Sequence, residues 1–155
     1  MRLFGHPIHP ALVAFPIALL GLTPVWDVLA MAGVMSDARL LAYYGQIAGL
    51  VAGGLAVVTG FADLLKIPES EAATVKVALT HAGFALGVLS LFGLAFAFRG
   101  PRTSAPGLLV VALDVAGTLA LGATGWLGGE LVFRRAVGVE ARGPAGPEVK
   151  TRQGT

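Results

Sequence analysis

The chain has 155 residues, enough for one domain and too few for a second core of useful size. Hydrophobic residues make up 55% of it and charged residues only 13%, whereas a soluble domain carries roughly 25% charge. The composition therefore indicates a membrane protein. The chain contains no Cys, which excludes disulfides and thiolate metal ligands from this sequence. The formal net charge is only +2, and the basic residues lie at segment ends, so nothing supports nucleic-acid binding.

Four apolar stretches follow one another, and each has the roughly 20 residues that a membrane-spanning helix needs. They cover residues 10–33, 40–66, 72–98 and 107–133. The polar connectors between them are short, so neighbouring helices must be antiparallel. The sequence therefore predicts an all-α fold, an integral membrane up-down four-helix bundle in one domain over residues 1–137. Residues 138–155 are rich in Gly, Pro and charge, which predicts a disordered cytoplasmic tail.

Lys and Arg residues near the helix ends predict the orientation. Eight of them lie on the side that holds both termini, and three lie on the other side. The eight are Arg2, Lys66, Lys76, Arg134, Arg135, Arg142, Lys150 and Arg152, and the three are Arg39, Arg99 and Arg102. Cytoplasmic loops carry the excess of positive charge, so a multi-pass protein with both termini in the cytoplasm is expected. No small-residue cleavage site follows the first apolar core, so we expect this span to be retained.

The two halves of the chain share a pattern. The segment after His9 is similar to the segment after His81, and Thr59–Phe61 in the second span matches Thr124–Trp126 in the fourth. In each half an acidic residue follows within a few positions. The pattern predicts two duplicated helical hairpins, which enter the membrane from the same side and are related by a pseudo-two-fold axis along the membrane normal.

Five ionisable residues are predicted to meet in one layer on the cytoplasmic side: His6, His9, Asp63, His81 and Glu130. All three His residues of the chain are among them. Ionisable groups within a bilayer are costly unless they are paired, hydrated or bound to metal. Imidazole and carboxylate are the ligands of Zn, Fe, Mn and Cu in proteins. The leading hypothesis is thus a redox-active transition-metal centre, with four of these residues as ligands and His6 as a further ligand or gate.

Two alternatives remain open. In the first, His9 and His81 are the two axial ligands of a b-type haem, and the protein passes electrons to a partner. In the second, the chain is a structural or assembly subunit without a cofactor. The carboxylates of the layer then form ion pairs with Lys66, Lys76 or Arg134, which hold the helix ends together. Nothing in the sequence decides whether the protein is an enzyme.

Two further acidic residues lie within the spans, and Asp114 is expected near mid-membrane. One interpretation makes Asp27 and Asp114 steps of a proton path from the outer face to the cytoplasmic layer. The favoured alternative pairs them with each other or with neighbouring polar groups. The candidate partners are Tyr43, Tyr44, Gln46 and Thr118.

The motifs together resemble a known family, the domain of unknown function 2231. The residues that carry the resemblance are His6–Pro10, Phe15–Ile17, Asp27, Thr59–Gly60, Asp63, His81 and Gly125–Val132. The resemblance covers about residues 5–139. It implies a four-helix protein of the bacterial inner membrane, in contact with lipid. It also favours a redox or respiratory membrane partner, because some members are fused to Rieske-type or cytochrome-like modules. Apart from the resemblance, a homo-oligomer is the other possibility, since the Gly-rich helix faces can serve contacts within or between chains. The family pattern often continues with an aromatic residue, a basic residue and His-Gly, where this chain has Phe133–Ala136. A ligand at that His would be missing here.

Overall fold

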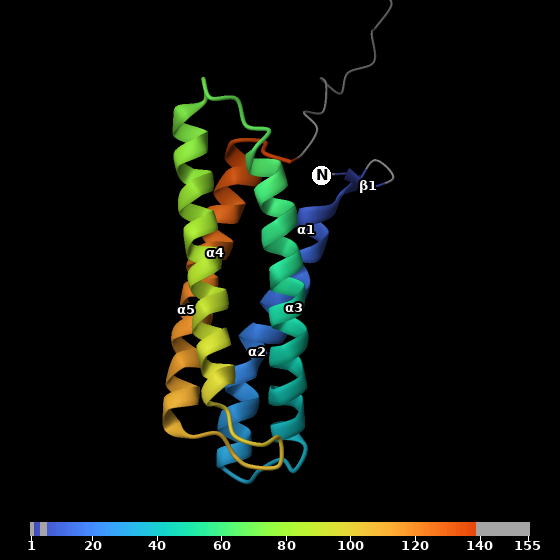
Figure 1. Cartoon of the computed structure of the whole chain (residues 1–155), viewed down its shortest axis with the longest axis vertical. Helices are drawn as coiled ribbons and strands as arrows, with labels where there is room; N and C mark the ends of the chain where they lie inside the picture. Colours follow the sequence, from blue (N-terminus) through green and yellow to red (C-terminus); the bar gives the residue numbers. More distant parts are fainter. Residues whose placement is uncertain (1, 4–5, 139–155) are drawn as a thin grey trace, which may run out of the picture.

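The apolar stretches form long helices that run alternately up and down in a computed structural model, which describes residues 2–3 and 6–138 and the side chains from Ile8 onward (Figure 1). The helices are α1 (Ile8–Leu12), α2 (Ala14–Met31), α3 (Ala38–Leu64), α4 (Ala72–Phe98), α5 (Leu108–Gly129) and the π-helix η1 (Glu130–Arg134). Two short strands precede them, β1 (Arg2–Leu3) and β2 (His6–Pro7), which pair antiparallel.

The helices coincide with the predicted apolar stretches to within two residues at each end. The described residues hold four helical spans long and apolar enough to cross a membrane: Ile8–Met31, Ala38–Leu64, Ala72–Phe98 and Leu108–Arg134. The first begins two residues before Pro10, which then lies in the first turn, where its missing N–H is not needed. Pro16 cannot donate to the carbonyl of Leu12, and this missing bond coincides with the boundary between α1 and α2.

The four long helices form a closed ring. α2 packs mainly against α3 and α4 mainly against α5, while α3 also contacts α4 and α2 contacts α5. Leu20, Val88 and Phe92 are buried together in the middle of the bundle. Glycines make room for the two largest of these side chains, because a Cβ on Gly49 would lie 2.6 Å from Leu20 and one on Gly117 would lie 2.7 Å from Phe92.

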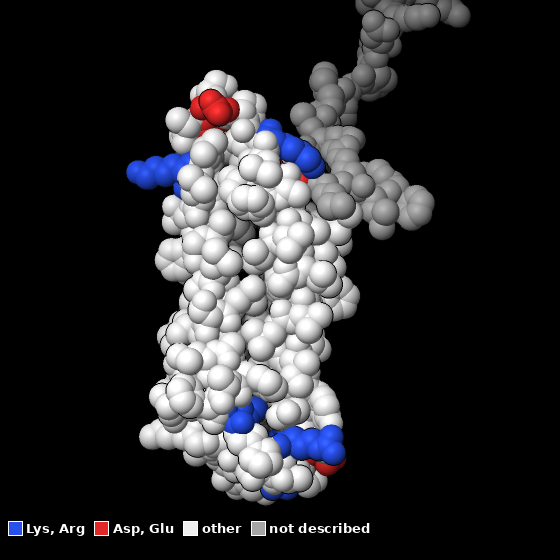
Figure 2. Space-filling model, viewed as in Figure 1, with Lys and Arg blue, Asp and Glu red and all other residues white. Residues whose placement is uncertain are grey.

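The outside of the bundle suits lipid. Large apolar side chains point outward, and Trp126 and Phe133 are 79% and 88% exposed. The charged side chains on the face seen in Figure 2 lie at the two ends, with an uncharged surface between them. One end carries the α2–α3 and α4–α5 connections, and the other carries the α3–α4 connection and the end of η1 (Figure 1).

Many buried positions of the two hairpins correspond to each other. The first helix of each hairpin matches at a spacing of 72 residues, so that Leu20 corresponds to Phe92. The second helix matches at a spacing of 68, so that Gly49 corresponds to Gly117. At these spacings, buried Pro16, Leu20 and Thr23 fall on buried Val88, Phe92 and Ala95, and buried Ala38, Ala42, Gln46, Gly49 and Ala56 fall on buried Pro106, Val110, Asp114, Gly117 and Thr124. The predicted duplication thus has a counterpart in the packing.

Candidate functional site

Two histidines face each other near one end of the bundle, and we call them the histidine pair. His9 is the second residue of α1, and His81 is the tenth residue of α4. Their ring centroids are 6.4 Å apart, and the ring planes cross at 87°. Both residues are partly buried. Because they come from different hairpins and correspond at the 72-residue spacing, the pair lies where the pseudo-two-fold axis is expected.

Each imidazole of the histidine pair is held by a backbone carbonyl of the second helix of its own hairpin. Nδ1 of His9 lies 2.8 Å from the oxygen of Ala56, and Nδ1 of His81 lies 3.0 Å from the oxygen of Thr124. A carbonyl oxygen can only accept, so Nδ1 must carry the proton in both rings. In a neutral imidazole the other nitrogen, Nε2, then keeps a free lone pair.

Each ring also lies against a glycine. A Cβ on Gly60 would come within 2.7 Å of Cε1 of His9, and a Cβ on Gly128 within 3.3 Å of Cε1 of His81. In both hairpins the glycine follows the accepting carbonyl by four residues, one turn of helix. Gly60 therefore corresponds to Gly128, at the 68-residue spacing. The sequence alignment of Thr59–Phe61 with Thr124–Trp126 was wrong by about one turn.

The two carboxylates of the predicted layer are engaged by basic residues. Asp63 forms an ion pair with Lys66 at 2.8 Å. Glu130 lies 3.4 Å from Arg134 and 3.7 Å from Arg135. The ion pairs Asp63–Lys66 and Glu130–Arg134, predicted as the structural alternative, are confirmed.

The predicted five-residue metal layer is therefore only partly assembled. Of its members, the structure brings together His9 and His81. Within the side chains that the structure describes, no group of three or more His, Cys, Asp or Glu residues could hold a metal ion. The side chain of His6 lies outside this described part, so its predicted role as a ligand or gate stays a prediction.

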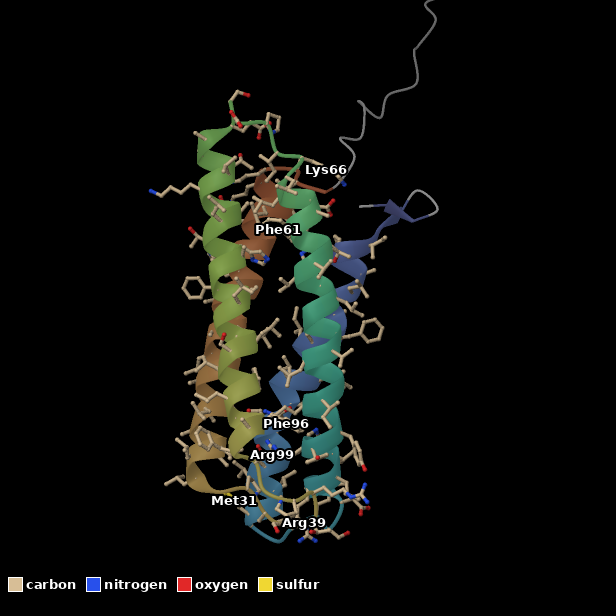
Figure 3. The ribbon with its side chains drawn as sticks, viewed as in Figure 1. Met31, Arg39, Phe61, Lys66, Phe96 and Arg99 are labelled. Atoms are coloured by element: carbon tan, nitrogen blue, oxygen red, sulfur yellow. The ribbon has the colours of Figure 1, made fainter. Side chains whose placement is uncertain are left out.

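A second polar group lies at the opposite end of the bundle, and we call it the arginine cluster: Asp27, Gln46, Arg99 and Asp114. Arg99 donates to both carboxylate oxygens of Asp27, at 2.6 and 2.8 Å, and to Asp114 at 2.8 Å. Its Nε donates to the Gln46 side chain at 2.7 Å, and Gln46 donates to Asp114 at 2.8 Å. The cluster therefore joins α2, α3 and α5 to the residue that follows α4. Figure 3 shows Arg99 and Phe96 at this end.

The arginine cluster is sealed from solvent. The side chains of Asp27 and Asp114 are 0% exposed, and that of Arg99 is 5% exposed. Burial lowers the pKa of the guanidinium, but the hydrogen bonds and charges of Asp27 and Asp114 outweigh it and raise the pKa of Arg99 above its usual value. The Arg99 guanidinium donates hydrogen bonds to both carboxylates and to the amide oxygen of Gln46 at the same time. A buried charge needs such hydrogen-bond partners to offset its desolvation.

The central residue of this cluster is not among the residues predicted from the sequence to pair with the buried acids. Gln46 is among them, and its bond to Asp114 confirms that prediction, whereas Arg99 enters the sequence prediction only through the orientation of the spans. The expected depth of Asp114 was wrong, since it is the seventh residue of α5 and the midpoint of that span is Leu121. The usable signal was a basic residue directly after the third span, on the same membrane side as Asp27 and Asp114.

The fourth span ends in a π-helix that begins at Glu130, directly after Gly128 and Gly129. Beyond it, Arg135 reaches back to the hydroxyl of Thr74 at 3.4 Å, and its Nε is buried without a hydrogen-bond partner in the described part of the chain. Wide turns of this kind recur at functional sites. Here the turn places Glu130 beside both Arg134 and Arg135.

Comparison with known proteins identifies a family. The family model described as "Predicted membrane protein (DUF2231)" matches residues 5–141. The match covers all four spans and both polar groups. No curated protein and no solved structure matches the chain.

Proposed function

The chain belongs to this DUF2231 family of predicted membrane proteins, and on that premise we propose that it binds one transition-metal centre through the Nε2 atoms of His9 and His81. The observation that carries the proposal is the anchoring of both rings by Nδ1 to backbone carbonyls, at 2.8 and 3.0 Å. Metal-binding imidazoles almost always donate their other ring N–H to such a group, because that bond selects the tautomer and the ring orientation.

The separation of the two rings is compatible with one metal ion bound between them. Two imidazoles that bind one ion from opposite sides, each at about 2 Å, have ring centroids about 6 Å apart. In the structure the centroids are 6.4 Å apart. With the nearby carboxylates in ion pairs, the donor set among the described side chains is two nitrogens, which suits Cu, Zn or Fe better than Mg or Ca. Mn prefers oxygen ligands, so it becomes the least suitable of the metals first considered.

Haem iron is the second candidate guest, and a specific observation favours it. The two imidazoles come from different hairpins, as the axial ligands on the two faces of a haem in a helical bundle do. A bare ion needs only the space between the rings, whereas a macrocycle also needs a flat slot between the helices. For this reason a bare ion is the leading form of the proposal. Bound copper or iron would supply one-electron chemistry, and the protein would then serve a redox partner in the membrane.

We also propose that the end with the histidine pair faces the cytoplasm of a bacterial inner membrane. The support is the excess of Lys and Arg on this side of the sequence. In this orientation the histidine pair lies near the cytoplasmic face, and the arginine cluster lies near the outer face.

The test is to purify the full chain in mild detergent, measure its bound metals, and record oxidised and reduced visible spectra. We expect one metal per chain, lost in His9→Ala and in His81→Ala. The matched controls are Asp63→Asn and Glu130→Gln, which should keep the metal because their partners are Lys66 and Arg134. After chelator treatment, titration with Cu⁺, Zn²⁺ and haemin reveals which guest returns.

Each outcome decides a different part of the proposal. A reduced-minus-oxidised haem spectrum that is lost in His81→Ala would identify haem as the bound cofactor. Loss of metal in the two carboxylate variants as well would restore the five-residue centre. A folded protein that binds none of the three added guests overturns the proposal and leaves the histidine pair as a structural contact.

A further inference from the structure

We propose that Gly60 and Gly128 are positioning residues, which set the orientation of the two imidazoles and keep both Nε2 atoms available. This inference rests on the proposed function for its meaning, but its geometry is independent of any guest. It concerns two glycines on α3 and α5 that do not themselves bind anything.

The imidazole of His9 contacts three residues of α3. Its Nδ1 bonds to the oxygen of Ala56 and lies 3.5 Å from the hydroxyl of Thr59, and its Cε1 lies over Gly60, one turn after Ala56. A Cβ at position 60 would be 2.7 Å from Cε1 and 3.0 Å from Nδ1. Real Cβ atoms essentially never approach so closely. Any side chain there would therefore push the ring away from the carbonyl that selects its tautomer.

The second ring repeats the arrangement. The imidazole of His81 bonds to the oxygen of Thr124, and its Cε1 would lie 3.3 Å from a Cβ on Gly128. The same three parts, an imidazole, a carbonyl and a glycine four residues on, occur in each hairpin. Their recurrence at the 72- and 68-residue spacings indicates one device used twice. Close packing of a histidine side chain against a helix would not by itself require both a carbonyl and a glycine four residues later in each hairpin.

Two other glycines of the same helices lack such a contact. A Cβ on Gly54 in α3 or on Gly125 in α5 would have no atom within 4 Å. Helix packing therefore does not require glycine at positions 54 and 125. Gly54→Ala and Gly125→Ala are matched controls for Gly60→Ala and Gly128→Ala, with the same chemical change in the same helix.

The first measurement uses metal-free protein labelled with ¹⁵N in its His side chains. The chain has only three His residues, so single His9→Ala and His81→Ala variants assign the resonances. At a pH where the imidazoles are neutral, we expect both rings to show a protonated Nδ1 and an unprotonated Nε2. Gly60→Ala should shift the His9 resonances and change this tautomer ratio, whereas Gly54→Ala should leave them unchanged. Gly128→Ala should act on His81 more weakly, since its neighbour needs to yield by only a few tenths of an ångström.

The second measurement is the affinity for Zn²⁺, used as the probe in competition with a chelator. Loss of the hydrogen-bond partner of a metal-binding imidazole costs about 10- to 100-fold in metal affinity. We expect a loss of this size for Gly60→Ala and a smaller one for Gly128→Ala, with neither control variant affected. If Gly60→Ala does not fold, Gly128→Ala and Gly125→Ala carry the test as a pair.

The readouts separate the two proposals. If the tautomers and their response to Gly60→Ala are as expected but Zn²⁺ does not bind, the positioning stands and the metal proposal fails. Unchanged His resonances and unchanged Zn²⁺ affinity in Gly60→Ala would overturn the positioning role. A wild-type protein with Nδ1 unprotonated in both rings would overturn it as well.

Discussion

Arg99 shows how one residue can hold several helices. Its guanidinium binds Asp27 on α2, Gln46 on α3 and Asp114 on α5. A buried ion pair adds little stability by itself, because desolvation offsets its attraction. Removing one partner is different, since it leaves an uncompensated charge in a place without water.

We therefore predict that Arg99→Leu lowers the free energy of unfolding by about 3–5 kcal/mol, the usual cost of breaking a buried pair. The measurement is unfolding in mixed micelles as the fraction of denaturing detergent rises. The control is Arg102→Leu, because Arg102 donates to the hydroxyl of Tyr44 at an exposed position, and exposed substitutions usually stay within about 0.5 kcal/mol.

The double variant Asp27→Asn with Arg99→Gln sharpens this prediction. It removes the charges of Arg99 and Asp27 together and leaves only that of Asp114, so its cost should be smaller than the summed costs of Asp27→Asn alone and Arg99→Gln alone. Equal effects of Arg99→Leu and Arg102→Leu would show that the arginine cluster does not hold the bundle together.

Within each hairpin the two helices touch through glycines at matching positions. Gly49 gives Leu20 its place in the core, and Gly117 does the same for Phe92. Both of those side chains are fully buried. Small residues allow such close approach in membranes, where packing replaces the hydrophobic effect between helices.

At this scale we predict that Gly49→Ala and Gly117→Ala each destabilise the protein by about 1–3 kcal/mol, the usual cost of overfilling a packed core. Gly54→Ala and Gly122→Ala, whose Cβ atoms would meet nothing within 4 Å, should be neutral or stabilise it by up to about 1 kcal/mol, since Ala favours helix over Gly. The same unfolding measurement applies. A stabilising effect at all four positions would contradict the assigned contacts.

For the whole molecule, orientation is the property that the fold leaves open, because the bundle would cross a membrane equally well either way. The absence of Cys makes single-cysteine labelling direct. Ser36 and Ser104 lie in the two connections at the end of the arginine cluster, and Ser70 lies in the connection at the other end; all three are exposed.

We predict that Ser36→Cys and Ser104→Cys react with a membrane-impermeant maleimide added outside intact cells, and that Ser70→Cys reacts only after permeabilisation. The physical reason is the excess of Lys and Arg on the Ser70 side, which is retained in the cytoplasm. The reverse pattern of labelling would place the histidine pair at the outer face.

Much of the fold could be predicted from the sequence because each helix that crosses a bilayer needs an apolar stretch of about 20 residues. The ends of the spans are correct to within two residues, since they depend on local composition alone. The pairs Asp63–Lys66 and Glu130–Arg134 were also predictable, because partners three or four residues apart meet on any helix.

Contacts between distant residues were decided by the tertiary structure. Arg99 and Asp27 are 72 residues apart, and no local pattern indicates that their side chains meet. The register of the hairpins was misjudged by one turn, because apolar helices resemble one another at several alignments. The spacing of 68 residues is distinguished from the alternatives by the carbonyls of Ala56 and Thr124, which bond to the two imidazoles, and by Gly60 and Gly128, on which the rings pack. The sequence by itself thus determined where the chain crosses the membrane, through the apolar length each span requires, whereas the two polar groups depend on side-chain register between helices, which only the folded bundle sets.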